Sequence, residues 1–114
     1  MGALTAGSVI LIPFPFSDLS NNKLRPAVVL ATLDKGDCIL CQITSKPYDN
    51  NAIELNQPDF KEGSLQRVSY ARPSKLFTAN ASLLQQQAGQ LTDACFLTVR
   101  EQVVKTIRGE AGKE

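Results

Sequence analysis

Histidine is absent from the 114-residue sequence, and this absence restricts the chemistry that the protein can carry out. Without histidine, Ser-His-Asp and Cys-His triads are excluded, and so is a ribonuclease that relies on a pair of histidines. The phosphate-binding motifs GxxxxGK[ST] and GxGxxG are also missing. The carboxylates are scattered singly through predicted loops, so we expect neither a metal ion nor another cofactor. Any catalysis must use arginine, lysine, hydroxyl groups or isolated acids.

An excess of one charge and long apolar runs are missing as well. The 12 Lys and Arg residues nearly balance the 11 Asp and Glu residues, so a polyanion would have to be bound by a local cluster of cations. No run approaches the roughly 20 apolar residues of a membrane helix, since Pro13 and Pro15 interrupt the best one. The first basic residue is Lys23, which does not fit the charged start of a signal peptide. We therefore expect a cytoplasmic protein that has no membrane partner.

Cysteine is scarce, and its odd count of three fits a reducing compartment. Cys38 and Cys41 form a CxxC, for which a redox or metal site is one interpretation. They lie in a strand-like apolar run, where residues three apart point to opposite faces of a sheet. We therefore favour the other interpretation, in which the thiols are buried and act as small apolar side chains.

Short apolar segments separated by turn-rich linkers predict a small antiparallel β-sheet. The turn at residues 33–36 is short enough to join two of these strands as a hairpin. Residues 17–23 and 46–51 are expected to be loops, and residues 58–63 to be polar and irregular. The segment 83–90 is expected to pair with the segment 68–76. The predicted strands cover residues 8–14, 26–32, 37–44, 52–55, 68–76 and 83–90.

One helix is predicted over residues 92–108. Thr92 is a suitable N-cap, and Gly109 provides a stop, after which we expect a frayed end. Between them, one apolar face repeats with helical spacing. Strands followed by a single amphipathic helix indicate one domain over residues 1–114, with a core at about 7–108. The predicted fold is mainly β, a small closed or strongly curved sheet with the helix packed on it.

Arg25 and Thr44 are the leading candidates for catalysis. Arg25 lies where a polar loop enters the second predicted strand, and Pro26 stiffens the backbone at that point. Thr44 ends the third predicted strand. The two residues are equidistant from a hairpin turn centred near residues 34–35, so their side chains can converge. Each also has an ordinary interpretation, as a surface charge and as a β-branched residue at a strand end.

An arginine beside a hydroxyl suits cleavage of an RNA backbone. When a ribose 2′-hydroxyl attacks the neighbouring phosphate, negative charge grows on the phosphate oxygens. A forked, permanently charged guanidinium stabilises this charge, and a hydroxyl adds a hydrogen bond. Because a guanidinium is a poor base, proton transfer is the weakest step of this mechanism.

Four segments and the closing helix carry a family resemblance. The segments are GSVILIPFPFSDL (Gly7–Leu19), KLRPAVVL (Lys23–Leu30), CQITS (Cys41–Ser45) and RPSKL (Arg72–Leu76). With the helix from Leu91 on, the resemblance extends from Gly7 to Arg108. In these parts the sequence resembles the MazF/PemK toxins of bacterial type II toxin–antitoxin systems.

The resemblance implies an SH3-like barrel, a homodimer, and an endoribonuclease that cleaves single-stranded mRNA at specific sequences without a metal. The products would be a 2′,3′-cyclic phosphate and a 5′-hydroxyl. It places the catalytic arginine at Arg25, with a part in proton transfer, and the catalytic threonine at Thr44. Some members have a glutamate at the position of Ser20, and the nearest acid here is Asp18. A cognate antitoxin is the implied protein partner, and DNA would be bound only by the complex with the antitoxin.

Polar and charged residues near these two positions are candidates for RNA binding. Single-stranded RNA requires a local track of cations for its phosphates. An acidic, disordered antitoxin tail could occupy the same track with its carboxylates in place of phosphates. The alternative is a solvated face without a shared role. The candidates are Asp18, Ser20, Lys23, Ser45, Lys46, Arg72 and Lys75.

Two other functions are compatible with such a barrel. One is a non-catalytic toxin that binds DNA gyrase, and the other is a binding module that has lost its activity. The presence of both Arg25 and Thr44 favours the ribonuclease, because a gyrase-binding protein does not need this pair. Ser20, in the position of an acid, mildly favours the inactive module.

Overall fold

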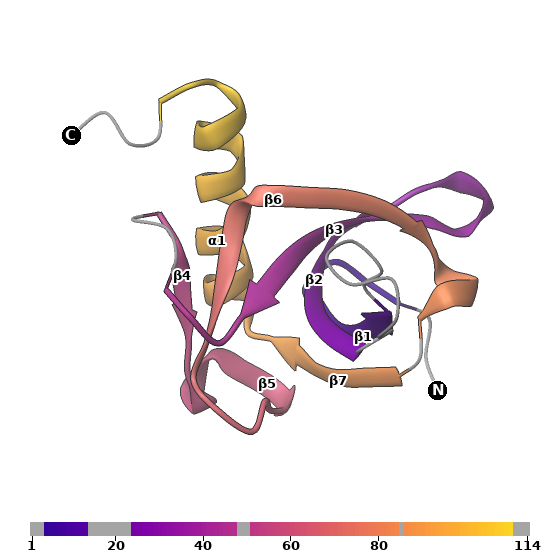
Figure 1. Cartoon of the computed structure of the whole chain (residues 1–114), viewed down its shortest axis with the longest axis horizontal. Helices are drawn as coiled ribbons and strands as arrows, with labels where there is room; N and C mark the ends of the chain where they lie inside the picture. Colours follow the sequence, from indigo (N-terminus) through magenta and orange to yellow (C-terminus); the bar gives the residue numbers. More distant parts are fainter. Residues whose placement is uncertain (1–3, 14–23, 48–50, 85, 111–114) are drawn as a thin grey trace.

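The computed structural model describes residues 4–13, 24–47, 51–84 and 86–110, which form seven strands and one α-helix (Figure 1). The sheet order is β4-β6-β3-β2-β1-β7-β5, and the paired strands are antiparallel. The sheet curls into a half-barrel, which confirms the predicted mainly β fold. The elements are β1 (Ser8–Pro13), β2 (Leu24–Thr32), β3 (Asp37–Thr44), β4 (Ile53–Leu55), β5 (Phe60–Gly63), β6 (Ser69–Asn80), β7 (Gln86–Leu91) and α1 (Asp93–Ile107).

Apolar side chains are buried on both faces of the sheet. Alternate residues such as Val28 and Cys41 join Val99 of α1 in one cluster. The residues between them on the strands, such as Val29 and Leu40, form a second cluster on the opposite face. Because both clusters are almost fully buried, the strands cannot slip by one residue without exchanging their faces.

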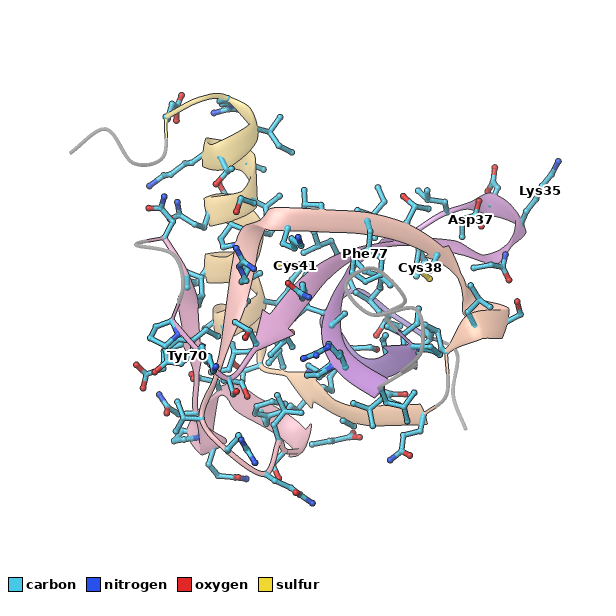
Figure 2. The ribbon with its side chains drawn as sticks, in the orientation of Figure 1. Lys35, Asp37, Cys38, Cys41, Tyr70 and Phe77 are labelled. Carbon is cyan, nitrogen blue, oxygen red and sulfur yellow. The ribbon has the colours of Figure 1, made fainter. Side chains whose placement is uncertain are left out.

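The two cysteines of the CxxC diverge, as predicted for a strand. Cys41 lies in the cluster under α1, and Cys38 lies in the cluster on the opposite face. Figure 2 shows Cys38 towards the hairpin turn that carries Lys35, away from Cys41. Burial raises the pKa of Cys41 to about 12, so its thiol stays neutral and acts as a small apolar side chain.

The helix is confirmed over the predicted span. The Thr92 hydroxyl accepts a hydrogen bond from the Cys95 backbone N–H at 3.1 Å, which is N-capping. Gly109 follows the helix with a positive φ of 79°, as expected at a C-terminal stop. In the part of the chain that the structure describes, no helix is both long enough and apolar enough to cross a membrane.

The later strands differ from the prediction in two respects. Residues 58–63, expected to be irregular, contain β5, which pairs with β7. Residues 83–90 were expected to pair with 68–76, but β7 pairs with β1 and β5, while β6 pairs with β3 and β4. The physical reason is the curl of the sheet, which brings β7 back to the first strand. The expected loop at 17–23 lies outside the described residues.

The pairing of β5 with β7 depends on a close approach of their backbones. Gly63 has a φ of +67°, and it pairs with Gly89. A Cβ added to Gly63 would overlap the backbone carbonyl oxygen of Ala88. Only glycine combines this φ with this contact.

Gly63→Ala should therefore destabilise the protein by more than Gly109→Ala. Gly109 also has a positive φ, but a Cβ there meets no atom within 4 Å, so its substitution adds only the backbone penalty of about 1–2 kcal/mol. At Gly63 the steric overlap should add roughly 1–3 kcal/mol. Urea unfolding of the two variants measures the difference, and equal losses would contradict the close β5–β7 contact.

Candidate active site

The β2–β3 hairpin places Arg25 and Thr44 at the same end of the sheet. The β2–β3 ladder ends at the pair Ala27–Gln42, and Arg25 and Thr44 each lie two residues beyond it on their strands. There Arg25 pairs with Ile12 of β1, and Thr44 pairs with Tyr70 of β6. The hairpin predicted from the sequence is confirmed, and both residues lie at the end away from its turn.

Arg25 and Thr44 line one cavity, which has a volume of about 610 Å³. Two arginines, Arg25 and Arg67, are the charged residues of its described lining, and no carboxylate is among them. The apolar part comes from residues of β1, β2, β3 and β7 and from Leu65, and the rest is mainly hydroxyl and amide groups. Such a lining is suited to a ligand that carries negative charge. The hydroxyl and amide residues are Thr44, Ser45, Ser64, Ser69, Gln66, Gln86 and Gln87.

The Thr44 side chain is oriented by the chain that follows it. Its Oγ1 accepts a hydrogen bond from the Lys46 backbone N–H at 3.3 Å. The hydroxyl hydrogen is then still able to donate to a ligand. Thr44 is half-buried, whereas Arg25 is exposed, so the hydroxyl lies deeper in the surface than the guanidinium-bearing residue.

The structure brings together some of the predicted RNA-binding residues and separates others. Ser45 lines the cavity beside Thr44, whereas Lys46, Arg72 and Lys75 are outside its lining. Arg72 lies on β6, where its Nη1 donates to the Gln42 Oε1 at 3.5 Å. The three remaining candidates, Asp18, Ser20 and Lys23, lie outside the described residues.

An irregular stretch of β6 determines where two of these cations lie. Residues 72–75 lie opposite Gln42 alone, between the pairs Ile43–Ala71 and Cys41–Leu76. The Cys41 thiol donates to the Arg72 backbone carbonyl at 3.1 Å and holds the start of this bulge. Arg72 and Lys75 therefore lie on β6, the strand that borders β3.

Sequence reasoning missed the contribution of residues 64–67 and of β7. Arg67, Gln66 and Ser64 line the cavity from the connection between β5 and β6, and Gln86 and Gln87 line it from β7. The sequence shows a polar, glycine-preceded segment and a run of glutamines, but neither pattern indicates a partner strand. Their position results from the pairing of β7 with β1 and β5, which is long-range.

The described residues offer neither a metal centre nor a reactive thiol. No group of three or more His, Cys, Asp or Glu residues that could hold a metal ion occurs in the part of the chain that the structure describes. Burial, and to a lesser extent the charge of Asp59, raise the pKa of Cys95 to about 11, so this thiol is neutral like that of Cys41. The chemistry of the cavity rests on guanidinium, hydroxyl and amide groups.

The chain thus combines a curled antiparallel half-barrel, one C-terminal helix and a cavity lined by arginine, hydroxyl and amide groups. The family model for the PemK-like, MazF-like toxin of type II toxin–antitoxin systems matches residues 5–107. The chain therefore belongs to this family. No curated protein gives a significant match.

Solved structures similar to this chain share its fold. One is the crystal structure of MazF (Form-I) from Deinococcus radiodurans, at 17% identity and a TM-score of 0.71, covering 96% of this chain and 99% of that chain. A MazE-MazF structure (Form-III) from the same organism has 18% identity and a TM-score of 0.70, with coverages of 96% and 100%. An endoribonuclease in complex with its cognate antitoxin, from Mycobacterial species, has 14% identity and a TM-score of 0.70, with 96% of each chain covered.

Proposed function

We propose that this toxin is an endoribonuclease that cleaves single-stranded mRNA in the cytoplasm at specific sequences. The observation that carries the proposal is that Arg25 and Thr44 line one cavity, whose described lining contains two arginines and no carboxylate. Structural neighbours that are named endoribonucleases support it. A cavity of this chemistry attracts a phosphodiester and does not repel it.

In the proposed reaction the ribose 2′-oxygen attacks the adjacent phosphorus. A bond forms between phosphorus and the 2′-oxygen, and the bond from phosphorus to the 5′-oxygen of the next nucleotide breaks. One proton leaves the 2′-oxygen and one reaches the 5′-oxygen, so the products are a 2′,3′-cyclic phosphate and a 5′-hydroxyl. Arg25 stabilises the negative charge on the non-bridging phosphate oxygens, and the Thr44 hydroxyl donates a hydrogen bond to one of these oxygens.

Arg25→Ala should lower the rate of RNA cleavage by about 10²–10³-fold, the usual loss when one preorganised donor is removed. Arg25→Lys should not restore the rate, because lysine lacks the forked pair of donors. The measurement is cleavage of a long RNA by purified protein in EDTA, with the cyclic phosphate ends identified by mass spectrometry.

Lys105→Ala is the matched control, since Lys105 is an exposed cation on α1 that does not line the cavity. Its rate should equal that of the wild type. Cleavage by Arg25→Ala at the wild-type rate would contradict the mechanism. Cleavage that EDTA abolishes and Mg²⁺ restores would assign the protein to another class of ribonuclease.

A twofold homodimer is the proposed form of the toxin. Leu24 and Val68 are each 47% exposed, and each directly precedes or follows an arginine of the cavity in sequence. Apolar side chains exposed beside a charged site are suited to contact with a second copy. A C₂ arrangement would join two such sites into one extended groove for a single RNA strand.

The proposed protein partner is an antitoxin whose acidic tail follows the same cationic track as the RNA. Structural neighbours are named as complexes with MazE or with a cognate antitoxin, which supports an antitoxin partner. Lys46, which follows the end of β3 at Thr44, and Lys75, which lies on β6 with Arg72, are both exposed. Carboxylates of a disordered tail could replace the phosphates there. DNA would be bound only by the complex with the antitoxin.

Lys75→Glu should weaken the binding of RNA and of an antitoxin peptide together, because the reversed charge repels both polyanions. Fluorescence anisotropy with each labelled ligand measures the two affinities, and both should also fall as salt concentration rises. Lys105→Glu is the control for the change in net charge. If Lys75→Glu impaired one ligand and left the other unchanged, the shared track would be wrong.

A further inference from the structure

Residues 64–67 form a wall between two neighbouring cavities. The cavity of about 610 Å³ that contains Arg25 and Thr44 lies against one side of this wall. A second cavity of about 200 Å³ lies against the same four residues, Ser64, Leu65, Gln66 and Arg67. Arg67 and Gln66 are therefore within reach of a ligand in either cavity.

The wall is held at both ends. At its start, Gly63 pairs with Gly89 of β7 so closely that no side chain fits at Gly63. At its end, the Ser69 hydroxyl, which is 4% exposed, donates to the Arg67 backbone carbonyl at 3.0 Å. In the middle, Leu65 packs against the core cluster under α1. Arg67 is thus an exposed cation on a fixed stretch of backbone, and this reduces the entropy lost when it binds a ligand.

The lining of the smaller cavity matches a flat ring with a polar edge. Phe60, Leu55 and Val68 give it an aromatic and apolar surface, and Gln57 and Gln66 add exposed amides. The amide of Asn56 is already engaged in capping the short turn at 57–59. Nucleobases are recognised by this combination, through stacking on an aromatic ring and hydrogen bonds to their edges.

The charge of the smaller cavity also suits a nucleotide. Of the described residues that line it, Arg67 alone is charged, and Arg67 also lines the larger cavity. A cation between a phosphate site and a base-sized hollow is placed to bind the phosphate that links two successive nucleotides.

We propose that the smaller cavity is a nucleobase subsite for the RNA. The nucleotide next to the cleaved bond places its base against Phe60, where Gln66 hydrogen-bonds to the base edge. Arg67 binds the phosphate that connects this nucleotide to the one at Arg25 and Thr44. The subsite rests on the proposed ribonuclease function and makes Gln66 and Arg67 determinants of sequence preference and of binding.

The test uses RNA in which every 2′-hydroxyl is replaced by fluorine, so that binding is measured without cleavage. Arg67→Ala should weaken binding of a fluorescein-labelled, single-stranded 2′-fluoro RNA and lower the slope of log affinity against log salt concentration by about 0.7, the value for one phosphate contact. Lys105→Ala, which removes a cation outside both cavities, should leave the slope unchanged.

Gln66→Ala should act differently, by relaxing the preference for one base and keeping the salt slope. Sequencing the bound fraction of a random 2′-fluoro RNA library measures this preference, and the enrichment at one position should fall roughly tenfold. Gln102→Ala on α1 is the matched control and should retain the wild-type enrichment. Both Gln66 and Arg67 are exposed, so their substitution spares the core.

An unchanged salt slope for Arg67→Ala together with unchanged enrichment for Gln66→Ala would overturn the subsite. That result is separate from a failure of the proposed function, which would show as the absence of cleavage of ordinary RNA by the wild-type protein. Binding of the 2′-fluoro RNA does not depend on cleavage, so the two failures can be told apart.

Discussion

The antiparallel register of β2 and β3 is held by apolar side chains buried on both faces of these strands, and the proposed site depends on it. Val28 and Cys41 are paired and buried under α1, while Val29 and Leu40 are paired and buried on the opposite face. A slip by one residue would place Gln42 or Asp37 in an apolar cluster, which is costly without hydrogen-bond partners. The core thus fixes Arg25 and Thr44 at the same end of the β2–β3 hairpin, where both line one cavity.

The rest of the cavity is built by contacts between distant parts of the chain. The sheet curls until β7 pairs with β1, and β5 then pairs with β7 through the Gly63–Gly89 approach. This closure carries the wall at 64–67 to the mouth of the hairpin site. Local pairing therefore provides the proposed catalytic pair, and long-range pairing provides the surface on which a substrate would lie.

This division explains what could be predicted from the sequence. The hairpin, the divergence of Cys38 from Cys41 and the helix capped by Thr92 all depend on neighbours in the chain, and all are confirmed. The strand β5 was missed because its sequence, FKEG, is short and polar and is stabilised by pairing with β7. A propensity for strand says little about which strands pair.

The same reasoning applies to the site. Arg25, Thr44 and Ser45 could be selected from the sequence because a hairpin turn relates the first two directly. Arg67 could not, because its place in the cavity requires the β5–β7 pair and the hydrogen bond from Ser69. Arg72 and Lys75 were selected as cations near the site, but the bulge opposite Gln42 determines their position and keeps them out of the cavity lining.

In the proposed mechanism Arg25 and Thr44 act as one unit on one phosphate, and a double-mutant cycle of RNA cleavage tests this coupling. The rates of Arg25→Ala, Thr44→Ala and the double variant are compared with the wild type in single-turnover reactions. When two residues act together, the effects of their substitutions on the activation free energy are not additive. The cleavage rate of the double variant should therefore be within roughly threefold of the rate of the slower single variant. A loss equal to the product of the two single losses would show that the residues act independently and would contradict the proposed mechanism.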